Sequence, residues 1–509
     1  MNALAVLYGG SLSEAALENV FSGKNALECA LERAGSFPGV NKIVLLAGED
    51  LETGKVSAIP GQRYFEGITR PVWTKKLLLD TLADISQGFD LTYYAWADCP
   101  LLDPILAGTI QERHTRYGAE YSYADGWPYG LAPELLSPGT AGILSKILGD
   151  SDEPVERDAI FSVIQRDINS FDIETEISPV DLRQYRLNLT ADSKRNLLIL
   201  TRLIGAGLSG VQGVEGILAE KPELLRTLPN FYPIQVSGPC PQQCELCPYP
   251  RLGPQEGFMD IRQFESLLDK IIGFSGDGVI DLSLWGELSL HPHKEELIRL
   301  VLDRPSLSLV IETSGIGWKP EGLEALAAES AQAKKRKTSL APLSWIVSLD
   351  AQDPEHYRKL RGQGYTEAME CAKKLVTLFP RDAYVQAVRV KGFEDDIEQF
   401  YRTWKKAGAR IIIQKYDSFC GFLPDLQASD LSPIQRRPCW HLMRDMAITL
   451  DGTVPLCREE LSSGRSLGNA LRDPLELIWS RGEKFYMEQC IPEYSGLCAR
   501  CDEYYTYNF

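Results

Sequence analysis

The sequence lacks the features that would assign it to a membrane or to nucleic acid. No stretch approaches the roughly 20 consecutive apolar residues of a membrane-spanning helix. The first ten residues have no basic segment and only a short apolar run, so we expect no signal peptide. Lys and Arg number 53 against 70 Asp and Glu, a net charge of -17, and no basic stripe is present. We therefore expect a cytoplasmic protein with no nucleic acid and no membrane among its partners.

Length and cysteine usage indicate several domains and at least one metal or cluster site. A chain of 509 residues is too long for one hydrophobic core, so we expect two to four domains. Eight of the 12 cysteines fall in two groups after residue 239. In a cytoplasmic protein such clusters indicate metal or iron-sulfur ligands rather than disulfides. The lone Cys29, Cys371 and Cys420 are expected to be buried as small apolar side chains.

The first 200 residues alternate short apolar strands with amphipathic helices. Residues 3–8 and 42–47 are predicted strands, with a predicted helix at 25–34 between them. A later strand from residue 93 is followed by a predicted helix at 104–117. This alternation is typical of a parallel α/β sheet.

Three short motifs in this segment resemble the cytidylyltransferase-like sugar nucleotidyltransferases. They are residues 98–103 (DCPLLD), 128–134 (PYGLAPE) and 189–192 (LTAD). The resemblance implies a Rossmann-like nucleotidyltransferase domain over residues 1–200. It also implies that Asp98 and Asp192 are candidate metal ligands.

The loop after the first strand departs from that family. The family holds its triphosphate there with basic residues, whereas residues 9–19 contain no Lys or Arg and carry Glu14 and Glu18. Acidic groups repel a triphosphate. We therefore expect a degenerate domain that binds a sugar-like ligand, a nucleotide or a partner. An active transferase is one alternative, and Asp98 and Asp192 as solvated acids at strand ends is another.

A glycine-rich stretch at residues 205–210 indicates a domain boundary. We predict a linker over 201–229, which would also hold one short helix. A central domain would then cover 230–420, and a small C-terminal domain would cover 421–509.

Three cysteines with the spacing C-x3-C-x2-C open the central domain. They are Cys240, Cys244 and Cys247. Three ligands on one loop leave one iron of a four-iron cluster open, which suits chemistry rather than a closed structural site. The alternative is a zinc knuckle that recruits His291 as its fourth ligand. We expect His291 and His293 to face solvent instead.

Six βα units follow, which predicts an open (β/α)6 TIM barrel rather than a closed one of eight. The predicted strands are residues 234–236, 279–284, 307–312, 345–349, 384–390 and 410–414. Polar residues sit where these strands end, among them Glu287, Thr313, Ser314 and Asp350. In such barrels the carboxyl ends of the strands line the active site.

Over residues 230–420 the chain resembles the radical SAM superfamily, whose signature is the spacing of the cysteine loop. Residues 285–287 (WGE) resemble its G-G-E motif, with Trp285 in place of glycine, and Leu246 replaces an aromatic residue that touches adenine. Residues 348–350 (SLD) resemble the segment that meets the ribose, and Arg361 resembles the arginine that pairs the methionine carboxylate. The residues implied to bind S-adenosylmethionine (SAM) are Trp285, Gly286, Glu287, Ser314, Ser348, Asp350 and Arg361.

This resemblance implies a 4Fe-4S cluster on Cys240, Cys244 and Cys247 that cleaves SAM reductively. The 5′-deoxyadenosyl radical so formed would abstract hydrogen from a small-molecule or peptide substrate, which the sequence does not identify. A flavodoxin or ferredoxin is the implied reductant. A bifunctional protein with an active cytidylyltransferase and a non-enzymatic, metal-stabilised scaffold are the alternatives.

The C-terminal domain carries the second cysteine group. Residues 446–450 and 453–457 are predicted to form a β-hairpin that turns at Asp451 and Gly452. Four cysteines there make a closed site for zinc or a cluster, namely Cys439, Cys457, Cys498 and Cys501.

The domain resembles the SPASM/twitch domains. Its C-x(9–15)-G-x4-C motif fits residues 439–457. The resemblance implies one auxiliary 4Fe-4S cluster on the four cysteines, which would relay an electron or brace the domain. Cys490 is expected to be a bystander.

Overall fold

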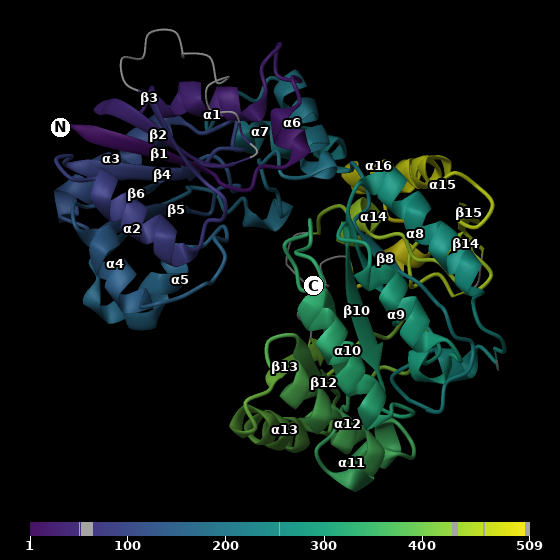
Figure 1. Ribbon diagram of the computed structural model, residues 1–509. Helices are drawn as coiled ribbons and strands as arrows, with labels where there is room; N and C mark the ends of the chain where they lie inside the picture. Colours follow the sequence, from purple (N-terminus) through teal and green to yellow (C-terminus); the bar gives the residue numbers. More distant parts are fainter. Residues whose placement is uncertain (50, 52–64, 254, 430–435, 462–463, 504–509) are drawn as a thin grey trace. The chain divides into compact units, whose positions relative to one another are not determined.

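The computed structural model describes residues 1–49, 51, 65–253, 255–429, 436–461 and 464–503. They form two compact units, Met1–Leu224 and Leu225–Phe509 (Figure 1). The predicted boundary at residue 200 is wrong, because it lies inside α6 (Lys194–Gly205). Most of the predicted linker 201–229 belongs to the first unit, where the Val211 amide donates to Oδ2 of Asp103 at 2.7 Å. The buried carboxylate of Asp103 therefore holds this segment on the first unit.

The first unit is built on a seven-stranded mixed sheet in the order β3-β2-β1-β4-β6-β5-β7. Its strands are β1 (Ala3–Gly9), β2 (Val40–Gly48), β3 (Phe65–Arg70), β4 (Leu91–Trp96), β5 (Tyr121–Asp125), β6 (Glu134–Leu136) and β7 (Ile173–Ile177). Its other helices are α1 (Ala26–Ala34), α2 (Lys75–Ile85), α3 (Pro104–Tyr117), α4 (Thr140–Leu148), α5 (Phe161–Ile164) and α7 (Val214–Glu220). Strands β1 to β4 are parallel to their neighbours in the β3-β2-β1-β4 run, so the predicted α/β fold is confirmed.

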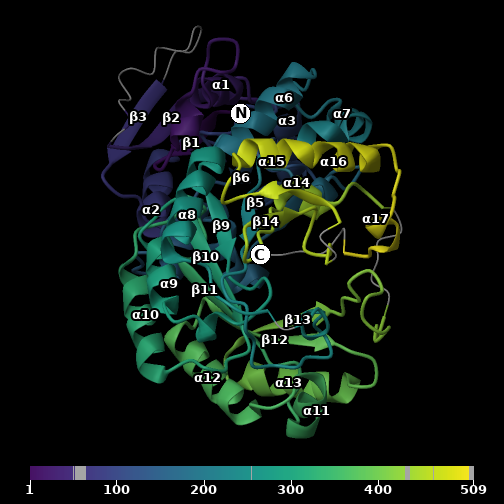
Figure 2. The same cartoon turned by 90° about the vertical axis from the view of Figure 1, so that its right-hand side faces the viewer.

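The second unit begins with six parallel strands in sequence order, which form an open sheet. They are β8 (Phe231–Pro233), β9 (Gly278–Asp281), β10 (Leu307–Thr313), β11 (Leu343–Ser348), β12 (Ala383–Arg389) and β13 (Arg410–Lys415). The helices between them are α8 (Ile261–Ser275), α9 (Lys294–Leu302), α10 (Pro320–Gln332), α11 (Pro354–Leu360), α12 (Tyr365–Leu378) and α13 (Glu394–Lys406). Figure 2 shows α8, α9, α10 and α12 along one side of this sheet. The predicted open (β/α)6 barrel is confirmed, although its first strand lies at 231–233 rather than 234–236.

The C-terminal part of the second unit consists of short elements. They are α14 (Trp440–Arg444), β14 (Thr453–Pro455), β15 (Ser466–Asn469), α15 (Leu475–Arg481), α16 (Glu483–Cys490) and α17 (Leu497–Arg500). Lys270 of α8 ties this part to the barrel, because its Nζ donates to the carbonyls of Ala470 and Leu471 at 2.9 and 3.2 Å. Among the described residues no helix is long and apolar enough to cross a bilayer.

The predicted hairpin between residues 446–450 and 453–457 is wrong. Strand β14 pairs with β15 instead. Residues 446–450 run parallel to the barrel edge, where the Ile448 amide donates to the Pro233 carbonyl at 2.8 Å and the Gln235 amide donates to the Ile448 carbonyl at 2.9 Å. An open sheet leaves the backbone groups of its edge strand unpaired, and this segment satisfies them.

We expect Ile448→Ala to lower the free energy of unfolding of the second unit by about 2–5 kcal/mol, because it leaves a cavity at this junction. The Ile448 side chain is fully buried, whereas Ile491 is 65% exposed. Ile491→Ala is therefore the control, with an expected change within about 0.5 kcal/mol. Denaturant unfolding followed by tryptophan fluorescence measures both variants. Equal effects would contradict a buried junction.

Candidate functional site

One pocket of about 1320 Å³, which includes space open to solvent, lies at the carboxyl ends of the barrel strands. Every residue that the sequence assigned to the central site lines it. They are Cys240, Cys244, Cys247, Trp285, Gly286, Glu287, Ser314, Ser348, Asp350 and Arg361. The fold brings these residues together because parallel strands end at the same edge of the sheet.

The cysteine loop is tied to the chain segment that carries Arg361. The Gln243 amide donates to the Arg361 carbonyl at 3.2 Å, and the Glu245 amide donates to the Leu360 carbonyl at 2.9 Å. Gln242 adds a third tie, since its Nε2 donates to the Gln363 carbonyl at 2.7 Å. Arg361 is therefore fixed beside the thiols by main-chain contacts as well as by its own side chain.

The three thiols fit a cluster ligand set. All three cysteines are half-buried. Burial raises the pKa of Cys240 to about 11 and that of Cys247 to about 12, and the neighbouring Cys244 adds to both rises. Thiols that are close enough to oppose each other's ionisation need a shared positive centre to be held as thiolates. An iron-sulfur cluster supplies such a centre.

Trp285 and Gly286 adopt left-handed backbone conformations, with φ of 53° and 68°. A Cβ at Gly286 would lie 1.9 Å from the Ser237 carbonyl oxygen, so only glycine fits there. The left-handed φ at Trp285 is also one that glycine adopts freely. The indole packs between two rings, stacked on Tyr249 with centroids 6.1 Å apart and tilted against Phe419 at 5.7 Å. Trp285 is the residue at which the sequence departs from the G-G-E motif. It combines this aromatic packing with a strained backbone conformation.

Both carboxylate oxygens of Glu287 accept hydrogen bonds from residues at the end of β10. Its Oε1 accepts from the Thr313 hydroxyl at 2.7 Å. Its Oε2 accepts from the amide and the hydroxyl of Ser314 at 2.8 and 2.7 Å. Four hydrogen bonds, counting one at 3.3 Å from the Ser289 amide, lock the loop after β9 against β10. Glu287 therefore shapes the pocket wall through its neighbours.

Asp350 and Arg361 form a buried ion pair in the same wall. Nη1 of Arg361 donates to Oδ2 of Asp350, while Oδ1 accepts from the Val388 amide at 2.9 Å. Their side chains are 2% and 11% exposed. Nε of Arg361 has no hydrogen-bond partner among the described residues. Part of a buried, fixed guanidinium thus remains available to an anionic group.

The expectation that His291 faces solvent is wrong, although His293 is exposed as predicted. His291 is 1% exposed, its Nε2 lies 3.1 Å from the Met259 carbonyl, and its Nδ1 accepts from the His293 amide at 3.1 Å. Both ring nitrogens have partners in the chain. His291 is therefore not set up as a fourth metal ligand for the cysteine loop.

The pocket also has polar residues that the sequence reasoning missed. Those on the barrel include Asp281, Glu312, Gln386 and Lys415. The signal was present for Glu312 and Lys415, which lie at the carboxyl ends of the predicted strands 307–312 and 410–414. Asp281 and Gln386 lie inside the predicted strands 279–284 and 384–390, so strand ends did not mark them. Arg458, from the C-terminal part, also lines the pocket, and no strand pattern marks it.

The second cysteine group also gathers. Burial raises the pKa of Cys439, and Cys501 and Cys498 add to the rise. The pKa of Cys457 is raised by burial in the same way, with further contributions from Cys439 and Cys501. Cys420 is buried as predicted, but its thiol hydrogen-bonds with Cys501, which raises the pKa of Cys420. The predicted ligand set is thus joined by a fifth thiol that its sequence position did not reveal.

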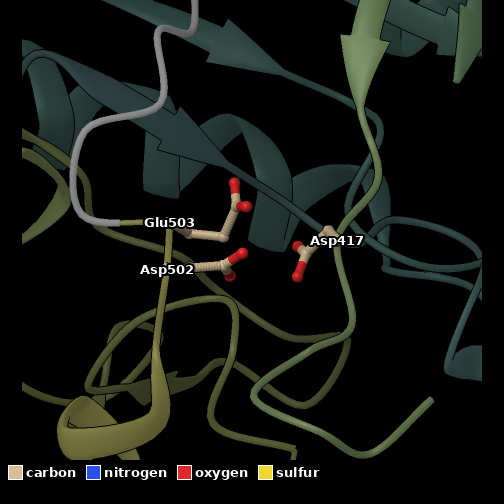
Figure 3. Close-up of side chains that lie close together, drawn as sticks. All are labelled: Asp417, Asp502 and Glu503. Atoms are coloured by element: carbon tan, nitrogen blue, oxygen red, sulfur yellow. The ribbon is translucent and has the colours of Figure 1, made fainter. Parts of the chain in front are cut away.

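A charged network has members that line the pocket and members that directly follow Cys457 and Cys501. The carboxylates of Asp417, Asp502 and Glu503 come within 4.8 Å of one another and point into one space (Figure 3). Lys415 contacts Asp502 at 2.7 Å and also Glu503. Arg458 contacts Asp417 at 3.4 Å and Glu503 at 3.7 Å. The two cations offset the acids, and the network joins the barrel to the residues that follow Cys457 and Cys501.

In the first unit the three resembling motifs meet at one edge of the sheet. The Asp103 amide donates to the Leu131 carbonyl at 2.7 Å, and the Ala191 amide donates to the Asp98 carbonyl at 2.8 Å. Gly130, at φ 99°, lies so close to the Leu189 carbonyl oxygen that a Cβ would be 2.5 Å from it. Motifs far apart in the sequence therefore form one local structure.

Asp98 and Asp192 meet there around Arg157. Its Nη1 and Nη2 donate to the two carboxylate oxygens of Asp98 at 2.8 and 2.6 Å, and Nη2 also donates to Oδ2 of Asp192 at 3.0 Å. Oδ1 of Asp192 accepts from Asn196 at 2.8 Å. The guanidinium also lies over the ring of Trp96, 4.1 Å from its centroid. A divalent ion does not fit these carboxylates unless Arg157 leaves.

Comparison with known proteins defines the class of the C-terminal part. Residues 439–502 match the SPASM family, an iron-sulfur cluster-binding domain. The match begins at Cys439 and ends one residue after Cys501. The chain is therefore an α/β protein that carries an iron-sulfur cluster-binding domain.

An uncharacterized protein of Treponema pallidum (strain Nichols) is 37% identical over 359 residues, which cover 69% of this chain and 98% of that protein. This chain belongs to the same family as that protein. A second uncharacterized protein of the same organism is 32% identical over 69 residues, 14% of this chain and 32% of that protein.

Solved structures show only distant similarity. SuiB of Streptococcus suis, bound to the precursor peptide SuiA, has a TM-score of 0.41 and 14% identity over 63% of this chain and 76% of that one. A cytidylyltransferase of Leptospira borgpetersenii serovar Hardjo-bovis (strain JB197) has a TM-score of 0.37 and 19% identity over 44% and 95%. Both TM-scores are below 0.5, so neither similarity bears on the function of this chain.

We expect Arg157→Ala to lower the free energy of unfolding of the first unit by about 3 kcal/mol, because Asp98 is left buried without its cation. Asp98→Asn in the same background should recover part of that loss, since it removes the unpaired charge. Arg183→Ala is the control, at an exposed arginine whose ion pairs with Asp125 and Asp181 should contribute below about 1 kcal/mol. Thermal and denaturant unfolding measure all three, and an Arg157→Ala loss no larger than the control would contradict the pairing.

Proposed function

We propose that this chain is a radical SAM enzyme with one auxiliary 4Fe-4S cluster. Cys240, Cys244 and Cys247 would hold the SAM-binding cluster and leave one iron open to SAM. One observation carries the proposal. The three thiols share a single pocket with the other residues assigned to SAM binding, and with Arg458, which directly follows an auxiliary cysteine.

The bound cluster would supply one electron that cleaves SAM to methionine and a 5′-deoxyadenosyl radical, which abstracts hydrogen from the substrate. The chain's own residues position SAM and exclude water. Because the Glu287 carboxylate is committed to β10, the main chain of residues 285–287 is what this motif offers a ligand. The stacked Tyr249 and Trp285 rings cover the pocket wall beside it.

Arg361 would pair the methionine carboxylate. Its ion pair with Asp350 fixes the plane of the guanidinium, and its Nε keeps an unused donor. A fixed, buried guanidinium loses little side-chain entropy on binding a carboxylate. Ser348 is held by a hydrogen bond of 2.5 Å to Glu312 beside the segment assigned to the ribose.

The auxiliary cluster would lie on Cys439, Cys457, Cys498 and Cys501. Arg458 and Asp417 line the pocket and also contact the chain beside these ligands. That continuity favours a cluster that accepts an electron from a substrate radical over one that only braces the domain. A small acidic reductant of the flavodoxin or ferredoxin class would recharge the first cluster.

For the first unit we propose a degenerate nucleotidyltransferase-like domain that works without a metal. Arg157 takes the position between Asp98 and Asp192 where the motifs imply a divalent ion. The loop at residues 9–19 offers Glu14 and Glu18, both exposed, and no basic group. Release of pyrophosphate from CTP by the chain with magnesium and sugar acids would contradict this.

We expect the anaerobically reconstituted protein to form 5′-deoxyadenosine from SAM when dithionite is added. Cys244→Ala should abolish the product, because a two-thiol loop does not retain the cluster. Cys29→Ala is the matched control, a half-buried cysteine in the first unit that should leave the product unchanged. Chromatography of quenched reactions measures it. An intact cluster that gives no 5′-deoxyadenosine would refute the proposal.

We expect about eight iron atoms per reconstituted chain, falling to about four in Cys457→Ala, because each cluster of this type holds four irons. Cys490→Ala should keep the full complement, since Cys490 lies outside the proposed ligand set. Iron and sulfide analysis with electron paramagnetic resonance measures the outcome. Zinc in place of iron in both sites would instead favour a metal-stabilised scaffold.

A further inference from the structure

Asp281 and Glu312 are pocket carboxylates that have no cation partner among the described residues. Asp281 ends β9, and Glu312 lies near the end of the adjacent β10. Both line the pocket. Among the described residues neither forms an ion pair with Lys, Arg or His. Of the other pocket acids, Asp350 and Asp417 do form such pairs, and Glu287 does not.

Within the part of the chain that the structure describes, the hydrogen bonds of these two groups come only from neutral donors. Oδ2 of Asp281 accepts from the Ser283 hydroxyl at 2.7 Å, whereas its Oδ1 has no partner among the described residues. Asp281 is 7% exposed, so water contributes little to its solvation. Oε1 of Glu312 accepts from the Ser348 hydroxyl at 2.5 Å and from Nε2 of Gln386 at 2.8 Å.

Burial raises the pKa of Asp281 to about 7, and Glu312 adds to the rise. Arg458 counteracts it only in part. Two carboxylates in one pocket repel each other, and the buried Asp281 additionally loses hydration. A positively charged group between them would relieve both costs.

The pocket's own cations do not fill this role, because other acids hold them. Arg361 is bound to Asp350, Lys415 to Asp502 and Glu503, and Arg458 to Asp417 and Glu459. Figure 3 shows three of these acids converging on one space. The acids that hold Lys415 and Arg458 outnumber them, so neither cation is left for Asp281 and Glu312.

We propose that Asp281 and Glu312 form the subsite for a protonated amine on the substrate. As a statement about substrate, this rests on the proposed function. Ammonium N–H groups would donate to Oδ1 of Asp281 and to Glu312, giving charge-assisted hydrogen bonds about twice as strong as neutral ones. A divalent metal is the weaker match, because no third metal-ligating side chain gathers with these two among the described residues.

An amine of this kind belongs either to a free metabolite or to a lysine side chain of a peptide. Cadaverine represents the first source, and Nα-acetyl-L-lysinamide represents the second. Their neutral counterparts are 1,5-pentanediol and Nα,Nε-diacetyl-L-lysinamide. Binding of one amine rather than the other identifies the source, and binding of both supports the shared chemistry.

The test is calorimetric titration of the reconstituted, SAM-loaded full chain with these four probes. At least one amine should bind at least about tenfold more tightly than its neutral counterpart, a difference of about 1.4 kcal/mol. Asp281→Asn and Glu312→Gln should each weaken that binding by about tenfold or more. Asp382→Asn is the control, a half-buried acid that precedes β12 at the opposite end of the barrel, and it should bind as the wild type does.

Iron content and unfolding temperature confirm that each variant is folded and loaded. Equal binding of amine and neutral probe, no binding of either amine, or undiminished binding by both pocket variants would overturn the proposal. Formation of 5′-deoxyadenosine by the same wild-type preparation without any probe tests the proposed function separately. An active preparation that binds no amine therefore fails only the subsite.

Discussion

The architecture of the second unit depends on one constraint, which is that six parallel strands end at the same edge. Parallel pairing in sequence order places the residue after each strand beside its neighbours. One pocket is therefore lined by the cysteine loop, by Glu287 and by the Asp350–Arg361 ion pair. None of these groups would be a site on its own. The same convergence places Asp281 and Glu312 on adjacent strands in one pocket, where their like charges repel each other.

An open sheet must also protect its edge. Residues 446–450 do so by adding to β8, and this brings the cysteines of the iron-sulfur domain close to the barrel. The charged network around Arg458 then links the two parts with four acids and two bases. Such a buried network has to be satisfied throughout, because a lost partner leaves an uncompensated charge. The arrangement of the auxiliary thiols is thereby coupled to the shape of the pocket.

The first unit shows how one side chain changes what a site can do. The three nucleotidyltransferase-like motifs pack together, and their main-chain contacts are intact. Arg157 nevertheless supplies the positive charge that the two aspartates require. A fixed guanidinium neutralises the carboxylates as a divalent metal ion would. Unlike a metal ion, it offers a bound phosphate no exchangeable ligand position.

Much of the molecule followed from local sequence signals. Continuous apolar runs predicted the strands, and the spacing of the cysteines pointed to the residues that the fold gathers in one pocket. These signals are local, because they are read from residues that are close together in the sequence. The sequence also determined the SPASM match and the acidic character of residues 9–19.

Tertiary structure alone decided which distant groups are neighbours. It placed Ile448 on the barrel edge instead of in a hairpin, buried His291, and set Cys420 beside Cys501. It inserted Arg157 between Asp98 and Asp192 and left Asp281 without a cation partner among the described residues. No spacing rule encodes such pairings, because they depend on how whole elements pack. The sequence named the residues that can carry charge, and only the packed chain determined which of those charges meet.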